Sequence, residues 1–148
     1  MREILFRAKR IDKGEWVEGY FVIGKWYLDE KERYAILPID LCFYPHCEIN
    51  EWIEIAPETL CQYTGLKDNN GKKIWENDIV LCKKYIGGNF VDYCIEYGYV
   101  EMKYGAFGIH RLNPDAYYRP FKDWLEDYEY EVIGNIFDNP ELLKGDIE

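Results

Sequence analysis

The fold is decided by residues 62–82, which read QYTGLKDNNGKKIWENDIVLC. The centre of this stretch, Asp68 to Gly71, consists of residues that favour turns. Asn70-Gly71 is the pair that a type I′ hairpin turn prefers at its two central positions. Apolar and β-branched residues flank the turn on both sides. The stretch therefore predicts a β-hairpin.

A core strand is expected directly after the hairpin. Asn77-Asp78 forms a second polar break, and the run from Ile79 to Cys82 is too short for a helix but apolar enough for a buried strand. Because side chains alternate between the two faces of a strand, Ile79 and Leu81 are expected to face the core together.

Alternating apolar and polar residues predict strands along most of the remaining chain. The first strand, Ile4 to Lys9, forms a hairpin with Trp16 to Ile23 across a polar turn at residues 12–14. The chain of 148 residues is long enough for one domain, 1–148, or for two subdomains, 1–60 and 61–148, joined near Ala56–Leu66. Further strands are expected at residues 34–37, 52–55, 59–63, 90–102, 104–109 and 131–137.

Helix is expected in two short places near the C-terminus. Apolar residues recur at spacings of three and four after Pro120, which predicts a short amphipathic helix over Pro120–Glu126. The segment from Asp138 to Glu141 combines a polar cap, a proline and an acidic residue. This combination begins helices, so a second helix is predicted over Pro140–Leu143.

The hairpin stretch also resembles the signature of the YopX family of phage and prophage proteins from low-GC bacteria. The matching segments within it are residues 62–68, 70–74 and 76–80. Residues 1–8 with 14–20 are similar to the opening of the family, and residues 132–143 to its close. The resemblance implies a β-rich fold of two small barrel-like (SH3-like) subdomains and no established activity. Asn77 stands where the family usually has glycine.

Composition and charge exclude several classes of function. The formal net charge is -10, and residues 121–148 carry nine acidic and two basic side chains. Direct binding to nucleic acid is not expected, because that affinity comes mainly from Lys and Arg displacing counterions. No apolar run approaches a membrane span, and the charged N-terminus lacks the apolar core of a signal peptide. The sequence therefore predicts a cytoplasmic protein, and the resemblance to phage proteins implies that the cell is a bacterial host.

The cysteines are expected to be reduced and structural. There are five of them, an odd number, at positions 42, 47, 61, 82 and 94. Cys42, His46, Cys47 and Cys61 are candidates for a zinc site, but the spacing matches no common ligand pair. Free cysteine is among the most buried residue types, so we favour burial over metal binding and expect no metal and no cofactor.

Catalytic patterns are not found in the sequence. The chain has no serine, and its two histidines, His46 and His110, have no nucleophile motif around them. No glycine-rich phosphate loop is present. Carboxylates are numerous, so a carboxylate-based hydrolase remains as a minor alternative.

The sequence thus favours a non-enzymatic protein that binds a protein partner or a second copy of itself. Residues 1–14 carry five basic and two acidic side chains. Arg7, Lys9 and Arg10 are the candidate partner-binding residues, and their simplest interpretation is the solvated face of an edge strand. The alternative is an acidic decoy that mimics nucleic-acid phosphates and occupies a host protein, using the glutamates from Glu48 to Glu58 or the group Asp123, Glu126 and Asp127.

Overall fold

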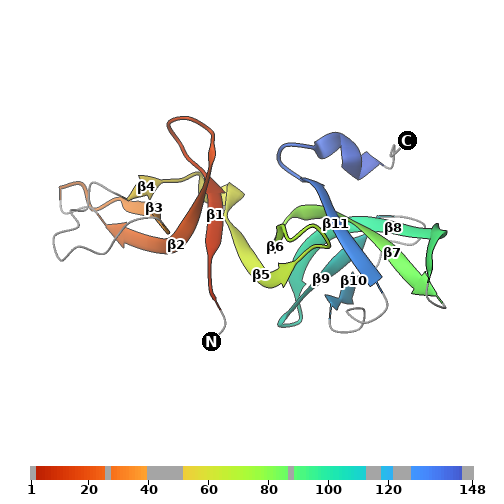
Figure 1. Cartoon of the computed structure of the whole chain (residues 1–148). Coiled ribbons are helices and arrows are strands. Elements are labelled where there is room, and N and C mark those ends of the chain that lie inside the picture. Colours follow the sequence, from red (N-terminus) through yellow and green to blue (C-terminus); the bar gives the residue numbers. More distant parts are fainter. Residues whose placement is uncertain are drawn as a thin grey trace. The chain divides into compact units, whose positions relative to one another are not determined.

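The protein is mainly β, as predicted (Figure 1). The computed structural model describes residues 3–25, 28–39, 52–86, 89–112, 118–121 and 128–144, with backbone alone for residues 84–86 and 89–96. The strands are β1 Phe6–Lys9, β2 Trp16–Lys25, β3 Glu32–Pro38, β4 Ile53–Glu54, β5 Cys61–Lys67, β6 Lys73–Trp75, β7 Asp78–Ile86, β8 Asn89–Lys103, β9 Ala106–Arg111, β10 Tyr118–Pro120 and β11 Tyr128–Asn135; two 3-10 helices, η2 and η4, cover Pro57–Thr59 and Pro140–Lys144.

The chain divides into two compact units, Met1–Tyr63 and Thr64–Glu148, called unit 1 and unit 2 below. One sheet has the strand order β4-β3-β2-β1-β5-β6, and the other has the order β10-β9-β8-β7-β11. Strand β5 begins in unit 1, where it pairs with β1, and continues into unit 2. Both sheets are antiparallel and, over the described strands, neither closes into a barrel, so the barrel-like part of the prediction is not seen.

Unit 1 is built on the hairpins β1-β2 and β2-β3. Ala8, Ile36 and Ile55 are fully or almost fully buried and form its core, with Phe6 and Phe21 among the apolar side chains packed on them. Just beyond β1 and β4, the backbones of Arg10 and Ile55 form an isolated antiparallel β-bridge, so the ends of these two strands lie side by side. The Ile11 N–H donates to the Glu54 carbonyl oxygen at 3.2 Å, and the Ala56 N–H donates to the Lys9 carbonyl oxygen at 2.9 Å.

Strand β1 is not an edge strand, so that expectation is wrong. It lies between β2, where Arg7 is opposite Glu18, and β5, where Arg7 is opposite Cys61. The second neighbour comes from a distant part of the chain. Alternation within residues 4–9 cannot reveal such a partner, because it reports only which residues share a face.

Unit 2 has a core on one face of its five-stranded sheet. Strand β7 contributes Val80 and Cys82 to this core, while Ile79 is fully buried on the opposite face and Leu81 is only half-buried. The expectation that Ile79 is buried is confirmed, but the main core takes the other alternation of β7. The remaining buried core residues are Ile74, Val100, Phe107, Ile109, Phe121 and Tyr130.

The two short helices predicted near the C-terminus are not confirmed as predicted. Pro140–Lys144 is a 3-10 helix. Pro120 ends β10 and Tyr128 begins β11, while residues 122–127, which carry most of the other predicted helix, lie outside the described residues. Among the helices of the described chain, none has the length and apolar character to cross a membrane.

Candidate functional site

The hairpin stretch that decides the fold is held by one buried carboxylate. Asp68 Oδ1 accepts hydrogen bonds from the backbone N–H groups of Asn70 at 2.9 Å and Lys72 at 2.8 Å. Asp68 Oδ2 accepts a third from the N–H of Val132 in β11 at 3.0 Å, and the Asn69 N–H donates to the Tyr130 carbonyl oxygen at 2.9 Å. The turn therefore covers part of the outer edge of β11, where exposed N–H and C=O groups would otherwise be open to strand pairing.

The turn itself is not of type I′, so that prediction is wrong. Gly71 has φ of +80°, but Asn70 is not among the residues at positive φ. The Gly71 N–H donates to the Asp68 carbonyl oxygen, and the Asp68 N–H to the Lys72 carbonyl oxygen. This is the pattern of a longer hairpin loop in which a single glycine takes the left-handed position.

The polar break at Asn77-Asp78 is also structural. Asn77 has φ of +66°, a left-handed conformation that asparagine tolerates as glycine does, so this position does not require glycine. Its N–H donates to the Val100 carbonyl oxygen at 2.8 Å. Asp78 is buried and accepts the Trp75 N–H at 2.8 Å. These two hydrogen bonds hold the backbone at the start of β7.

The predicted basic strip divides into two parts in the structure. Arg7 is only 9% exposed, and its guanidinium carbon lies 4.7 Å from the centre of the Trp16 ring. The Lys9 ammonium lies 5.4 Å from the same ring. Arg10 instead makes a bidentate salt bridge with Asp12, in which Nε donates to Oδ1 at 2.9 Å and Nη2 donates to Oδ2 at 2.8 Å. The description of Arg7 as a solvated side chain is therefore wrong, whereas Arg10 belongs to a different surface.

That second surface is a hollow of about 300 Å³ in unit 1, called the unit 1 hollow below. Two large apolar side chains of its lining are exposed, Ile11 at 59% and Trp52 at 43%. The hollow lies beside the place where the Ile11 N–H is bonded to β4, which brings these distant residues together. It is lined by Arg10, Ile11, Asp12, Trp52, Ile53 and Glu54.

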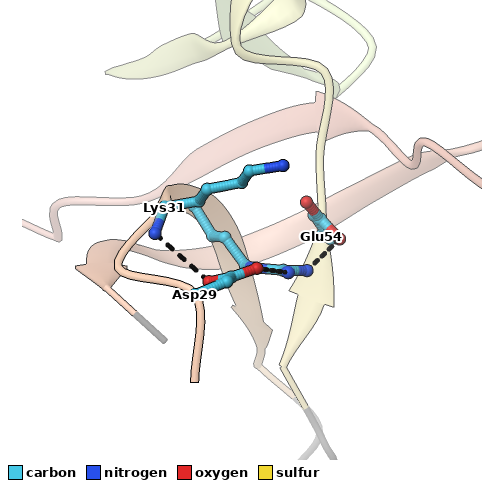
Figure 2. Close-up of polar contacts among 4 residues, drawn as sticks. Asp29, Lys31 and Glu54 are labelled. Carbon is cyan, nitrogen blue, oxygen red and sulfur yellow. Dashed lines mark hydrogen bonds and ion pairs between the residues drawn. The ribbon is translucent and has the colours of Figure 1, made fainter. Parts of the chain in front are cut away.

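Carboxylates outnumber basic side chains only in the lining of the unit 1 hollow, where Asp12 and Glu54 lie with Arg10. Figure 2 shows the polar contacts that hold Asp29 and Glu54 in place beside β3. One Arg33 nitrogen lies 2.7 Å from Asp29 and another 3.5 Å from Glu54, while the Lys31 N–H donates to Asp29 at 3.2 Å. Hydrogen bonds from Arg33 and from the Lys31 N–H lower the pKa of Asp29, and the bond from Arg10 lowers the pKa of Asp12. Counting Lys31, the three carboxylates Asp12, Asp29 and Glu54 are matched by three basic side chains, so the negative excess is confined to the lining of the hollow.

The YopX protein family model matches residues 5–144. The chain belongs to the YopX family. A solved structure that it is similar to is the crystal structure of protein EF1440 from Enterococcus faecalis, with 24% sequence identity over 97% of this chain and 99% of that one, and a TM-score of 0.46. No curated protein matches the chain.

The side chains of two cysteines in this YopX protein, Cys61 and Cys82, are described, and both are buried as expected. Cys61 donates a weak hydrogen bond from Sγ to the Thr59 carbonyl oxygen at 3.3 Å, and Cys82 lies in the core of unit 2. Cys42, His46 and Cys47, the other members of the proposed zinc set, lie outside the described residues. Within the described ranges, no cluster of three or more metal-ligating side chains is found.

His110 lies on unit 2, in a cross-strand row with aromatic neighbours. Its Nδ1 is 3.3 Å from Glu101 Oε1, and its ring stacks on Tyr99 with the ring centres 4.9 Å apart. Burial and the neighbouring Glu101 charge raise the pKa of Tyr99. In the described part of the chain, the side-chain hydrogen bond of His110 goes to Glu101 and not to a hydroxyl or thiol. A histidine and a carboxylate can move a proton, but nucleophilic catalysis also needs a nucleophile in contact with them.

Sequence reasoning missed Ile11 and Trp52, although each leaves a signal. Ile11 is an apolar residue inside a polar turn, between Arg10 and Asp12. Trp52 is a large aromatic residue in an acidic segment, directly after Glu51. Neither signal says that the two side chains line one hollow.

Proposed function

We propose that this chain is a non-enzymatic binding protein and that the unit 1 hollow receives a side chain from another protein. The observation that carries this proposal is the convergence of the exposed Ile11 and Trp52 on one hollow edged by Asp12 and Glu54. Aromatic and aliphatic side chains that meet in a pocket are typical centres of protein interfaces. In this proposal the protein acts as a phage-type protein in the cytoplasm of a bacterial host.

The preferred occupant is an apolar or aromatic side chain next to a lysine or arginine. The apolar part would lie against Ile11 and Trp52, and the positive charge would face Asp12 and Glu54. The volume of about 300 Å³ is at the lower end of the range for ligand pockets, which fits one or two side chains rather than a large cofactor. The net charge of -10 adds a long-range attraction for basic partners.

A peptide array tests this directly. The array carries short peptides in which one Tyr, Phe or Leu is followed by Lys, Glu or Gly. We expect the wild type to bind the Lys series most strongly, and both Ile11→Ser and Trp52→Ala to lose at least tenfold in affinity. Leu28→Ser is the matched control, because Leu28 is 89% exposed and does not line the unit 1 hollow. Equal binding by Trp52→Ala and wild type would contradict the proposal.

The acidic decoy remains a second candidate, favoured by the net charge. Of its proposed carboxylates, Glu54 and Glu58 are described and both are exposed, while Glu48, Glu51 and the group Asp123, Glu126 and Asp127 lie outside the described residues. A decoy competes with the nucleic acid that it imitates. Duplex DNA should therefore displace a captured basic host protein from the wild type, whereas binding through the unit 1 hollow is insensitive to DNA and sensitive to Trp52→Ala.

A further inference from the structure

The hairpin between β8 and β9 ends in an exposed aromatic side chain on an unusual backbone. Tyr104 has φ of +53° and Gly105 has φ of +77°, the two positive values of a type I′ turn. The first of these positions normally holds Asn, Asp or Gly, because the left-handed conformation is unfavourable for other residues. Tyr104 is nevertheless there, and it is 88% exposed. The burial of its ring in unit 2 therefore does little to explain this choice of residue.

Neighbouring side chains hold this hairpin tip in one arrangement. The Tyr118 hydroxyl donates to the Ala106 carbonyl oxygen at 2.6 Å and lies 3.1 Å from that of Lys103, so it connects β10 to both sides of the turn. The Tyr118 ring meets the Tyr104 ring edge to face, with centres 6.1 Å apart. The Lys103 ammonium lies 5.4 Å from the Tyr104 ring and 5.9 Å from the Tyr118 ring. The tip thus presents an aromatic ring and a positive charge side by side.

This tip is complementary to the unit 1 hollow in both polarity and charge. The tip offers Tyr104 and Lys103, and the hollow offers Ile11 and Trp52 next to carboxylates. We propose that the hairpin tip of a second copy of this chain occupies the unit 1 hollow. Tyr104 of one copy lies against Ile11 and Trp52 of the next. This inference rests on the proposed function of the hollow and names its occupant.

Charge assists the same contact. Lys103 faces the side of the hollow that carries Asp12 and Glu54, the two carboxylates that its lining sets against the single guanidinium group of Arg10. Exposed charges attract over about 10 Å at 0.1 M salt and about 3 Å at 1 M salt. Association is therefore stronger at low salt. Because the tip and the hollow are different surfaces, the contact is head-to-tail, and each copy can bind one neighbour through its tip and another through its hollow.

Mixing two variants provides the decisive test. Tyr104→Asn removes the aromatic side chain of the tip and leaves the hollow intact, and Asn suits the turn. Trp52→Ala damages the hollow and leaves the tip intact. Sedimentation velocity at low salt should show concentration-dependent assemblies for wild type and for the control Leu28→Ser. Each variant alone should be monomeric, and an equimolar mixture should form dimers and nothing larger, since only one intact tip-hollow pair remains.

Three results would overturn the inference: a monomeric wild type across the accessible concentration range, a mixture that stays monomeric, or assembly that survives Trp52→Ala. The peptide array separates this failure from failure of the proposed function. If lysine-containing peptides still bind in a Trp52-dependent manner while the wild type stays monomeric, the hollow binds a different protein and only the second-copy occupant is wrong.

Discussion

Replacing Asp68 by Asn tests whether the hairpin turn stabilises unit 2 by covering β11. Oδ1 of Asp68 accepts two N–H groups of its own turn, and Oδ2 accepts the N–H of Val132. An asparagine has one acceptor oxygen in place of two. If that oxygen keeps the two turn bonds, the amide nitrogen faces the Val132 N–H, which is a donor against a donor.

The expected loss follows from that one bond. A hydrogen bond to a charged group contributes about 1.5–3 kcal/mol, and a half-buried N–H without a partner adds a desolvation cost. We expect Asp68→Asn to lower the free energy of unfolding by about 2–3 kcal/mol. Asp68→Ala removes all three bonds, but water replaces those of the exposed turn, so the loss should be only slightly larger, about 3–4 kcal/mol.

The pH dependence has a definite sign. Burial acts to raise the pKa of Asp68, but hydrogen bonds from the N–H groups of Val132, Lys72 and Asn70, with the charge of Lys72, outweigh it and lower the pKa. A carboxyl whose pKa is lowered on folding stabilises the native state above its unfolded pKa of about 3.9. This stabilisation disappears as the pH falls through the folded-state value. The difference between wild type and Asp68→Asn should therefore shrink below about pH 4.

Urea unfolding followed by circular dichroism measures these differences as shifts in midpoint at constant slope. Asp12→Asn is the matched control, because Asp12 also has a lowered pKa but lies exposed in a surface ion pair with Arg10. Its midpoint should remain near that of wild type. A loss below about 0.5 kcal/mol for Asp68→Asn, or a loss that stays constant from pH 7 to pH 3, would refute the role assigned to the bond with Val132.

Three further predictions use the same urea titration. Ile79→Ala should cost about 2–5 kcal/mol, because Ile79 is fully buried; a loss below about 1 kcal/mol would mean that its site collapses or is wet. Gly71→Ala should cost about 1–2 kcal/mol through its φ of +80° alone, since a Cβ there meets no atom within 4 Å, and an unchanged midpoint would show that the turn adopts another conformation. Tyr104→Asn should change stability by less than about 1 kcal/mol, because relief of the left-handed backbone offsets the lost contact with Tyr118; a larger loss would show that Tyr104 serves the fold.

Local sequence determined the β class and the places where the chain turns. Turn residues at Asp68–Gly71 and alternation in residues such as those of β2 depend on φ preference and on the two faces of a strand, and both are properties of neighbouring residues. The type of each turn could not be predicted from its two central residues alone. Asn70-Gly71 suits a type I′ turn, but the pairing of Asp68 with Lys72 sets a longer loop, and a true type I′ turn forms at Tyr104-Gly105 instead.

Tertiary structure alone decided which surfaces are open. Arg7 has the sequence context of a solvated strip, yet β5 pairs with β1 and the side chain is buried. Ile11 and Trp52 line one hollow because a turn after β1 is hydrogen-bonded to β4. Both outcomes depend on contacts between residues about forty to fifty-five positions apart along the chain. Alternation within a strand tells which residues share a face. Whether that face is covered or exposed depends on the packing of segments that are distant in the sequence.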